Sequence, residues 1–297
     1  MVGKQERRYQ RMITVVLALI SLIMVIPLVL LVVASFTSNN EIVLHGYSFF
    51  PKELSLEAYR YIWNERAQVF HAYGITILVT AIGTTIGVMM TLLYAYVLAH
   101  EKFPGKTFLA FYLFFTMLFN GGLVPTYIMY TRYLHMKNTI PALIIPGLLM
   151  SAFNVILTRT YIQSNVPAAL SEAAKIDGAT EFQVFRKVVL PMCKPIIATV
   201  GLFAGLGYWN DWTNGLYYIT DTNKFSIQQL LNNMIKNIEF LSKNANSNIN
   251  LVSVGGGIPQ ETVRMAIAIV GLLPILIVFP FVQKYFVKGI SIGAVKG

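Results

Sequence analysis

The sequence predicts an all-α membrane protein with six transmembrane helices, on the basis of its composition and of the length and spacing of its apolar segments. Of its 297 residues, 56% are hydrophobic and 12% are charged, about half the charged fraction of an average soluble domain. Crossing the hydrocarbon core takes about 20 apolar residues. Six segments meet this need, namely 12–36, 73–99, 108–130, 139–158, 195–212 and 265–286.

The first apolar segment follows a basic stretch, Lys4 to Arg11, so it could be read as a secretory signal. Its apolar run, 13–34, is longer than the roughly 7–15 residues of a signal peptide, and no convincing cleavage site follows it. We therefore expect a retained transmembrane helix.

The distribution of charge predicts how the chain is oriented. With the amino terminus placed inside the cell, the inside segments carry 14 of the 23 Lys and Arg residues and 5 of the 13 Asp and Glu residues, leaving 9 and 8 outside. Such an excess of Lys and Arg marks the cytoplasmic side, so both termini are predicted to be cytoplasmic. The net charge of +10 thus reflects membrane orientation and indicates no nucleic-acid partner.

Three of the predicted spans carry small or helix-breaking residues. Gly83 and Gly87 in the second span favour close helix packing, within the chain or against another subunit. Asn120-Gly121-Gly122 interrupts the third span, and Pro146-Gly147 falls in the fourth. Broken helices are tolerated in a membrane only where protein or a water-filled cavity satisfies the freed backbone groups. These breaks are therefore packing kinks or the lining of a transport route, and Asn120 is a candidate residue of that route.

The fifth span ends in Trp209, Asn210, Asp211 and Trp212. Tryptophans near a membrane surface commonly form an aromatic belt, but an acidic residue at that depth usually faces a cavity or a partner. Aromatic faces beside hydrogen-bonding groups also suit sugars. These four residues are therefore candidates for a substrate path.

Two outside segments separate the spans. Segment 37–72 contains a possible amphipathic helix over 55–64, and we group it with the first span as a region covering 1–72, followed by a core covering 73–297. Segment 213–264 is rich in Asn and Lys. It is either a contact surface for something outside the membrane or disordered.

The residues that could carry chemistry are few. The four histidines are scattered without metal-ligand spacing, and the single cysteine, Cys193, excludes an internal disulfide. Gly105-Lys106-Thr107 looks like the end of a phosphate-binding loop, but the motif needs a glycine where His100 stands. We therefore expect no catalytic residue, no metal, no cofactor and no ATPase activity in this chain.

The inside segment 159–194 is polar and predicts a first short helix. Pro167 suits a helix start because its missing N–H needs no partner there, and the alanine-rich stretch 168–174 favours helix. Gly178 then falls where a left-handed C-terminal cap is expected.

A second short helix is expected directly after that glycine. Thr180 to Gln183 fits a capping box, and Leu190-Pro191 ends the helix. Helices this short are marginal alone in water, so we expect one face to dock into a groove on another protein. The alternative is a segment lying on the membrane, but Glu172 and Asp177 would meet anionic lipid unfavourably.

At these residues the chain resembles a known family. Glu172-Ala173-Ala174, with Gly178 after three intervening residues and Leu190-Pro191 further on, is similar to the signature cytoplasmic loop of binding-protein-dependent ABC importer permeases. The surrounding residues resemble the carbohydrate branch, the group of the maltose transporter's smaller permease. Segment 120–127 resembles permeases of the lipoprotein or complex-polysaccharide type. The likeness covers nearly the whole chain, with Val188 standing where isoleucine is usual.

This resemblance implies a type I ABC importer permease fold whose coupling helix lies between spans four and five. It implies that the chain helps import a sugar, expected to be an oligosaccharide, across a bacterial cytoplasmic membrane. The partners would be a second, homologous permease, two cytoplasmic ABC ATPase subunits that bind ATP and Mg, and an extracytoplasmic sugar-binding protein. The residues that would couple the chain to the ATPase are Glu172, Ala173, Ala174, Lys175, Asp177, Gly178, Leu190 and Pro191.

Two alternative functions are weighed against this one. A secondary transporter driven by an ion gradient would usually carry ionisable relays inside the membrane, and the spans contain almost none beyond Asp211, which lies at an end. A non-transporting membrane scaffold is the other alternative.

Overall fold

The computed structural model describes residues 4–100, 103–245 and 259–294. In that part of the chain the regular structure is helical, apart from one isolated antiparallel bridge between Thr37 and Leu54. Three of the described helices are long and apolar enough to cross a membrane, and the number rises to five if each of two bent helix pairs is one span. The prediction of an all-α membrane protein is confirmed.

The described residues divide into two compact units, one formed by those within 1–69 and 231–274 and the other by those within 70–230 and 275–297. The first unit contains three helices from the start of the chain and parts of two later ones. They are α1 (Lys4–Ser35), α2 (Asn39–His45), α3 (Glu57–Asn64), most of α14 (Ile227–Ala245) and the first part of α16 (Gln260–Ala294).

Polar contacts join the early and late segments of the first unit. The Asn39 side chain accepts a hydrogen bond from the N–H of Glu261, and the Tyr47 hydroxyl donates to the carboxylate of Glu261, both at 3.0 Å. Helix α3 confirms the helix predicted over 55–64, with Ile62 buried and Trp63 exposed. The predicted boundary between 72 and 73 stays a prediction.

Most of the second outside segment is ordered. It forms α13 (Thr213–Tyr218), the 3-10 helix η3 (Thr222–Lys224), α14 and the start of α16. The disordered alternative is therefore wrong for 213–245, whereas 246–258 lies outside the described residues.

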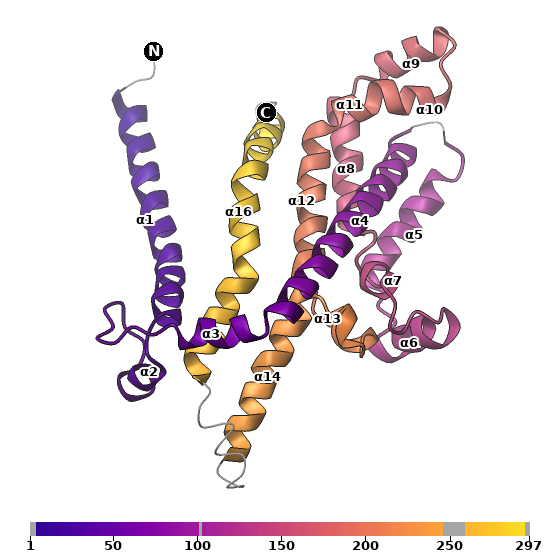
Figure 1. The fold of residues 1–297 in the computed structure, drawn as a ribbon. Coiled ribbons are helices and arrows are strands. Elements are labelled where there is room, and N and C mark those ends of the chain that lie inside the picture. The colour runs from indigo at the N-terminus through magenta and orange to yellow at the C-terminus, as the bar shows by residue number, and fades with distance from the viewer. Residues whose placement is uncertain (1–3, 101–102, 246–258, 295–297) are drawn as a thin grey trace. The chain divides into compact units, whose positions relative to one another are not determined.

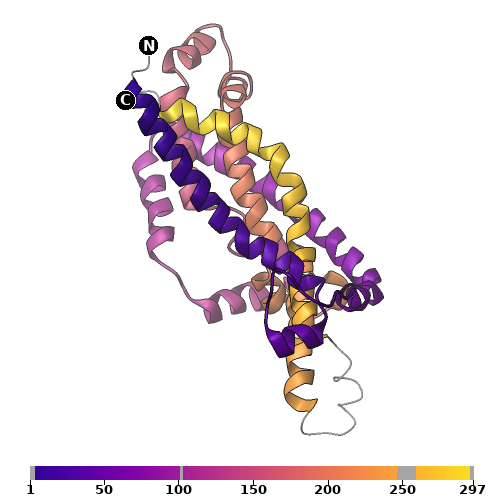
Figure 2. The same ribbon diagram turned by 90° about the vertical axis from the view of Figure 1, so that its left-hand side faces the viewer.

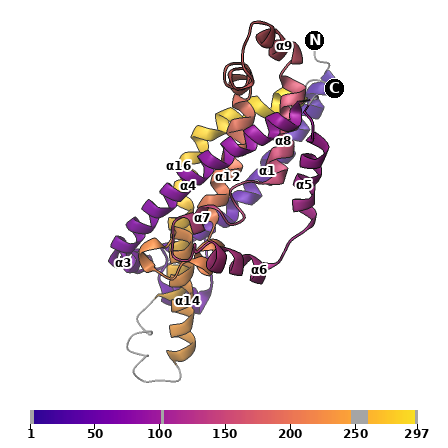
Figure 3. The same ribbon diagram turned by 90° about the vertical axis from the view of Figure 1, so that its right-hand side faces the viewer.

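The second unit contains most of α4 (Arg66–Ala99) and the broken third and fourth spans. The third span consists of α5 (Lys106–Leu118), then α6 (Leu123–Ile128) and the π-helix η1 (Met129–Tyr133). The two parts meet at 114°, because Gly122 adopts a left-handed φ of +83°. Figures 2 and 3 show α6 running across the direction of α5. The predicted break at 120–122 is confirmed.

The fourth predicted span does not form a continuous helix. It consists of the short helix α7 (Pro141–Ile144) and of α8 (Ala152–Asn165), separated by a turn in which Gly147 has a φ of +71°. Carbonyl groups freed by this break find donors on later helices: the Tyr208 hydroxyl bonds Ile144 O and the Asn214 amide bonds Pro146 O, each at 2.9 Å. Protein groups thus satisfy the broken backbone, as a membrane interior requires.

The glycines of α4 allow close packing within the chain. A Cβ added at Gly83 would lie 2.4 Å from the Tyr208 ring, and one at Gly87 would lie 2.6 Å from the backbone oxygen of Leu149. The close packing predicted for Gly83 and Gly87 is therefore confirmed, and these contacts are made within the second unit.

Candidate functional site

The polar segment predicted between the fourth and fifth spans forms a hairpin of short helices. It runs from the end of α8 through α9 (Ala168–Ile176), α10 (Glu181–Val184), the π-helix η2 (Phe185–Val189) and α11 (Leu190–Met192) into α12 (Lys194–Asn210). We call residues 166–193 the coupling loop, after the role that the family resemblance implies for this segment. Figures 1 and 3 show α9 beyond the ends of α8 and α12, at the end of the second unit opposite to α6.

The turn of the coupling loop is built around Gly178, which has a φ of +85°. The N–H of Gly178 bonds Lys175 O at 3.0 Å, and the N–H of Ala179 bonds Ala174 O at 2.9 Å. This pair of bonds is a Schellman motif, which uses a left-handed residue to satisfy the last carbonyl groups of a helix. The predicted left-handed cap at Gly178 is confirmed.

The second helix of the coupling loop opens with the predicted capping box. The N–H of Thr180 donates to the side chain of Gln183 at 2.9 Å, and the N–H of Gln183 donates to the Thr180 hydroxyl at 3.4 Å. These reciprocal bonds satisfy two N–H groups at the start of α10. The chain direction after the glycine turn is thereby fixed by local contacts.

The two arms of the coupling loop differ sharply in burial. Val184, Phe185 and Val189 are buried in a hydrophobic core shared with α4, α5, α8 and α12. By contrast, α9 has no buried residue, and the side chain of Ile176 at its end is 87% exposed. The second arm therefore anchors the loop in the membrane helices, while the first arm presents apolar surface to its surroundings.

The eight residues for which the family resemblance implies ATPase coupling lie together on this loop. Ala174 and Leu190 are half-buried and pack against the shared core, whereas the others are exposed. Those exposed are Glu172, Ala173, Lys175, Asp177, Gly178 and Pro191.

A polar cluster connects the glycine turn to the end of α4, and the sequence alone gave no sign of it. Lys175 forms an ion pair with Glu181 across the turn, and the Tyr96 hydroxyl donates to Glu181 Oε2 at 2.9 Å. Lys175 Nζ also donates to His100 Nε2 at 3.3 Å. The bond from Lys175, and then that from Tyr96, lower the pKa of the Glu181 carboxyl, so it is ionised at neutral pH.

The residues predicted for a substrate path at the end of α12 serve local structure. Asp211 Oδ1 accepts the N–H groups of Thr213 and Asn214 at 3.0 and 3.2 Å, so this carboxylate caps the first turn of α13. The Asn210 amide donates to Leu206 O within its own helix at 3.0 Å. An acid at a helix start has a structural use that the sequence pattern did not reveal.

The remaining path candidates lie at two places. The ring centroids of Trp209 and of Tyr73 on α4 are 6.3 Å apart, and Trp212 is exposed between α12 and α13. Asn120 lies in the other break, where its side chain accepts the N–H of Gly122 at 2.9 Å and so stabilises the turn between α5 and α6.

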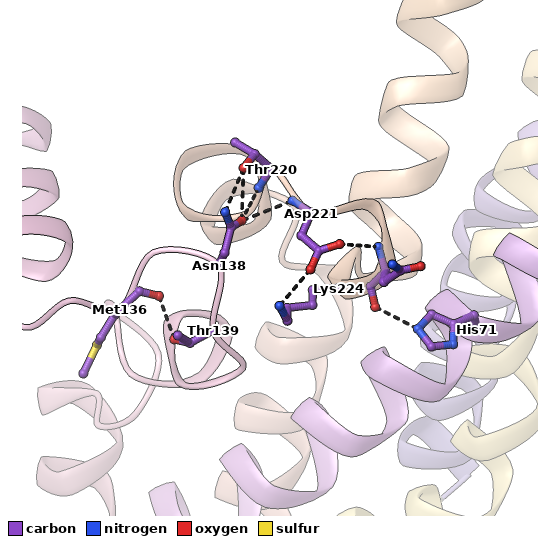
Figure 4. Close-up of polar contacts among 8 residues, drawn as sticks. His71, Met136, Asn138, Thr139, Thr220, Asp221 and Lys224 are labelled. Atoms are coloured by element: carbon purple, nitrogen blue, oxygen red, sulfur yellow. Dashed lines mark hydrogen bonds and ion pairs between the residues drawn. The ribbon is translucent and has the colours of Figure 1, made fainter.

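A second polar network lies at the end of the unit opposite to the coupling loop, and Figure 4 shows it. Asn138 Oδ1 accepts the N–H groups of Thr220 and Asp221 at 2.6 and 3.1 Å. Lys224 pairs with Asp221 at 2.8 Å, and the His71 ring donates to Asn223 O at 2.7 Å. These bonds tie the loop before α7 and the start of α4 to the segment after α13.

A cavity of about 430 Å³ lies in the second unit and is open to its surface. Its wall is formed by α4, by the break between α7 and α8, by the start of α8 and by α12, and none of the predicted path residues lines it. The lining residues are Gly87, Thr91, Gly147, Leu148, Leu149, Ser151, Phe153, Asn154, Val200, Phe203, Ala204 and Gly207. The signals that pointed toward it were the glycines of the second span and the break in the fourth.

Within the described residues, no group of three or more His, Cys, Asp or Glu side chains is arranged to hold a metal ion. The candidate sites in this part of the chain are the exposed helix α9 and a cavity.

Comparison with known proteins gives consistent matches. A polygalacturonan/rhamnogalacturonan transport system permease protein of Bacillus subtilis (strain 168) is 35% identical over 293 residues, which cover 99% of this chain and 100% of that protein. A melibiose/raffinose/stachyose import permease protein of the same organism is 28% identical and covers 97% of each chain. A solved bacterial ABC transporter involved in the import of the acidic polysaccharide alginate contains a chain that is 27% identical, with a TM-score of 0.77 over 96% of this chain and 99% of that one.

The family match spans the parts of the molecule described above. Residues 96–292 match the binding-protein-dependent transport system inner membrane component, a range that includes the coupling loop and most of the cavity wall. The chain therefore belongs to the family of binding-protein-dependent transport system inner membrane components, the permease subunits of ABC transporters.

Proposed function

We propose that this permease imports an oligosaccharide across a bacterial cytoplasmic membrane, driven by ATPase subunits that bind the coupling loop. A second, homologous permease completes the membrane part, two ABC ATPases bind ATP and Mg on the cytoplasmic side, and a sugar-binding protein delivers the cargo outside. Both termini of this chain are then cytoplasmic, in line with its excess of Lys and Arg on that side.

The exposed apolar surface of α9 is the observation that carries this proposal. Leu170 and Ile176 on this nine-residue helix are 46% and 87% exposed, and Phe182 beyond the turn is 65% exposed. Fully burying a side chain of this size contributes about 1.5–3 kcal/mol, so a helix that leaves them open gains stability from a groove on a partner.

The coupling loop is also held firmly enough to transmit movement to the membrane helices. Its second arm is fixed in the core through Phe185 and Val189, and its turn is held by the cap at Gly178 and the capping box at Thr180. Closure of the ATPase dimer on α9 then moves the attached membrane helices, since packed elements shift as units. Glu172 lies exposed in the middle of α9, available to the partner.

The cavity supports a carbohydrate as cargo. Its wall combines polar side chains (Thr91, Ser151 and Asn154) with two phenylalanines, Phe153 and Phe203, and carries no charged residue. Hydroxyl-rich molecules with apolar faces suit such a lining. The relatives named above are named for transport of polygalacturonan and rhamnogalacturonan, of melibiose, raffinose and stachyose, or of alginate, so we propose that the cargo is an oligosaccharide.

A docking experiment tests the coupling loop. Leu170→Ser and Ile176→Ser are introduced separately, and the ATPase that co-purifies with the detergent-solubilised complex is quantified. Each change should weaken ATPase binding, by about tenfold or more for Ile176, because the apolar area that becomes buried is lost.

Leu134→Ser is the matched control for Leu170→Ser. Leu134 is 50% exposed, close to the 46% of Leu170, but it follows η1 at the opposite end of the unit. It should leave ATPase binding unchanged. Equal ATPase recovery from all three variants and the unaltered complex would contradict the docking role of α9.

Transport itself is measured with proteoliposomes that contain both permeases and the ATPases. Uptake of oligogalacturonides, raffinose and alginate oligomers is compared, with the sugar-binding protein present and ATP inside or absent. ATP-dependent uptake of one of these sugars is expected. Uptake driven by a proton or sodium gradient without ATP would favour the secondary transporter instead.

A further inference from the structure

The coupling loop touches α4 although the two are far apart in the sequence. Helices α8 and α12 continue directly into the loop, so they follow its movement through the chain itself. Helix α4 ends at Ala99 and has no such link. Helix α4 can therefore follow the loop only through packing contacts, either with the loop itself or with helices such as α12 that are continuous with it.

These contacts have a polar and an apolar part. The Tyr96 ring lies 5.2 Å from Phe185 and 4.7 Å from His100, edge-on to the latter. Its hydroxyl reaches past this packing to Glu181, the first residue of α10, at 2.9 Å. Glu181 in turn pairs with Lys175 in the last turn of α9, so one carboxylate joins α4, α9 and α10.

Helix α4 also forms part of the cavity wall. Gly87 and Thr91 line the cavity, and Tyr96 follows nine and five residues later on the same uninterrupted helix. At 1.5 Å per residue these separations are about 14 and 8 Å. A displacement of the Tyr96 end therefore reaches the cavity wall without a hinge between them.

We propose that Tyr96, Glu181 and Lys175 form a clamp that makes α4 move together with the coupling loop, so that movement of the loop reshapes the cavity wall. Tyr96 is a positioning residue in this proposal, because it acts through Glu181 and contacts neither the ATPase nor the cargo. The inference rests on the docking of the ATPase at α9 and adds the route by which that movement reaches the cavity.

Two measurements on the assembled complex test the clamp. In the first, spin labels on Leu93→Cys of α4 and Lys187→Cys of the loop, both exposed positions, report the distance across the clamp. In the second, N-ethylmaleimide labels Ser151→Cys, an exposed position in the cavity wall. Both are made with and without trapping by ATP, Mg and vanadate, and the fully buried Cys193 stays unlabelled.

The clamp predicts an unchanged spin-label distance on trapping, together with a changed labelling rate at position 151. Tyr96→Phe keeps the ring packing but removes the hydroxyl. A hydrogen bond to a charged group typically favours the bonded state by about tenfold or more. Because the Glu181 side chain is exposed, we expect a smaller effect here, about fivefold. In this variant the distance should broaden on trapping, and the change in labelling rate should shrink about fivefold.

Tyr94→Phe is the matched control, since Tyr94 lies on the same helix but its hydroxyl donates to Leu109 O of α5, at 3.1 Å, and not to Glu181. Tyr94→Phe should give the same spin-label distance and labelling rates as the unaltered complex.

Glu181→Gln keeps an oxygen that can accept the bond from Tyr96, so part of the change in labelling rate on trapping should remain. In a complex that already carries Glu181→Ala, adding Tyr96→Phe should not reduce that change any further, because the hydroxyl has no carboxylate to bond.

The amount of co-purified ATPase separates this inference from the proposed function. Tyr96→Phe should leave it unchanged. If ATPase binding depends on α9 and yet Tyr96→Phe leaves both the distance and the labelling response intact, the clamp is wrong and the docking proposal stands. If changes in α9 leave ATPase binding unaffected, the docking proposal fails, and the clamp loses its source of movement with it.

Discussion

Replacing Gly178 tests whether the left-handed backbone conformation at this residue is needed for coupling, separately from side-chain contacts. The residue has a φ of +85°, and a Cβ built on it has no atom within 4 Å. A Cβ there therefore adds no steric clash with neighbouring groups. The effect of Gly178→Ala then comes from the left-handed conformation of the backbone.

The magnitude follows from the preferences of L-residues. Placing a non-glycine residue in the left-handed region costs about 1–2 kcal/mol, which lowers the population of the ordered turn by a factor of about 5–30. Valine should cost more than alanine because its branched Cβ crowds the backbone. Asparagine tolerates the conformation best, so Gly178→Asn should retain most of the coupling.

The assay is substrate-stimulated ATP hydrolysis and uptake by the reconstituted complex. Gly105→Ala is the control, because Gly105 has a similar φ of +92° but caps the start of α5, outside the coupling loop. We expect uncoupled hydrolysis in Gly178→Val and normal coupling in Gly105→Ala. Full coupling in Gly178→Val, or an equal defect in Gly105→Ala, would refute the reasoning.

Two further substitutions test packing away from the loop. Gly83→Ala places a methyl group against the Tyr208 ring and should destabilise the complex by about 1–3 kcal/mol, which lowers its unfolding temperature. Gly74→Ala is the control, because its Cβ would lie in open space, and it should leave the unfolding temperature unchanged. Asn138→Ala removes the acceptor for the N–H of Thr220 and should cost about 1–3 kcal/mol. Hydrogen exchange over 218–224 should then rise, and an unchanged exchange rate there would contradict the role given to Asn138.

The parts of the site that were predicted correctly depend on contacts between near neighbours in the chain. The left-handed cap at Gly178, the capping box at Thr180 and the break at 120–122 each involve residues within a few positions of one another. Such motifs form wherever their residue types recur, so their spacing in the sequence is sufficient to identify them.

The parts that the sequence did not reveal depend on contacts between distant segments or on a second use of one residue. Asp211 caps α13, a use that its local sequence did not indicate, and its place on a substrate path stays a prediction. The bond from Tyr96 to Glu181 joins residues 85 positions apart. No local pattern marks that tyrosine among the others of the chain.

By itself, the sequence determined the class of this protein, the approximate places where its helices begin and break, and the position of the coupling loop, because hydrophobic length and capping chemistry act locally. The tertiary structure decided which arm of the loop is buried, which residues line the cavity and which side chains join the loop to α4. Those outcomes depend on how helices pack against one another. Packing brings together residues whose separation in the chain carries no information about their separation in space.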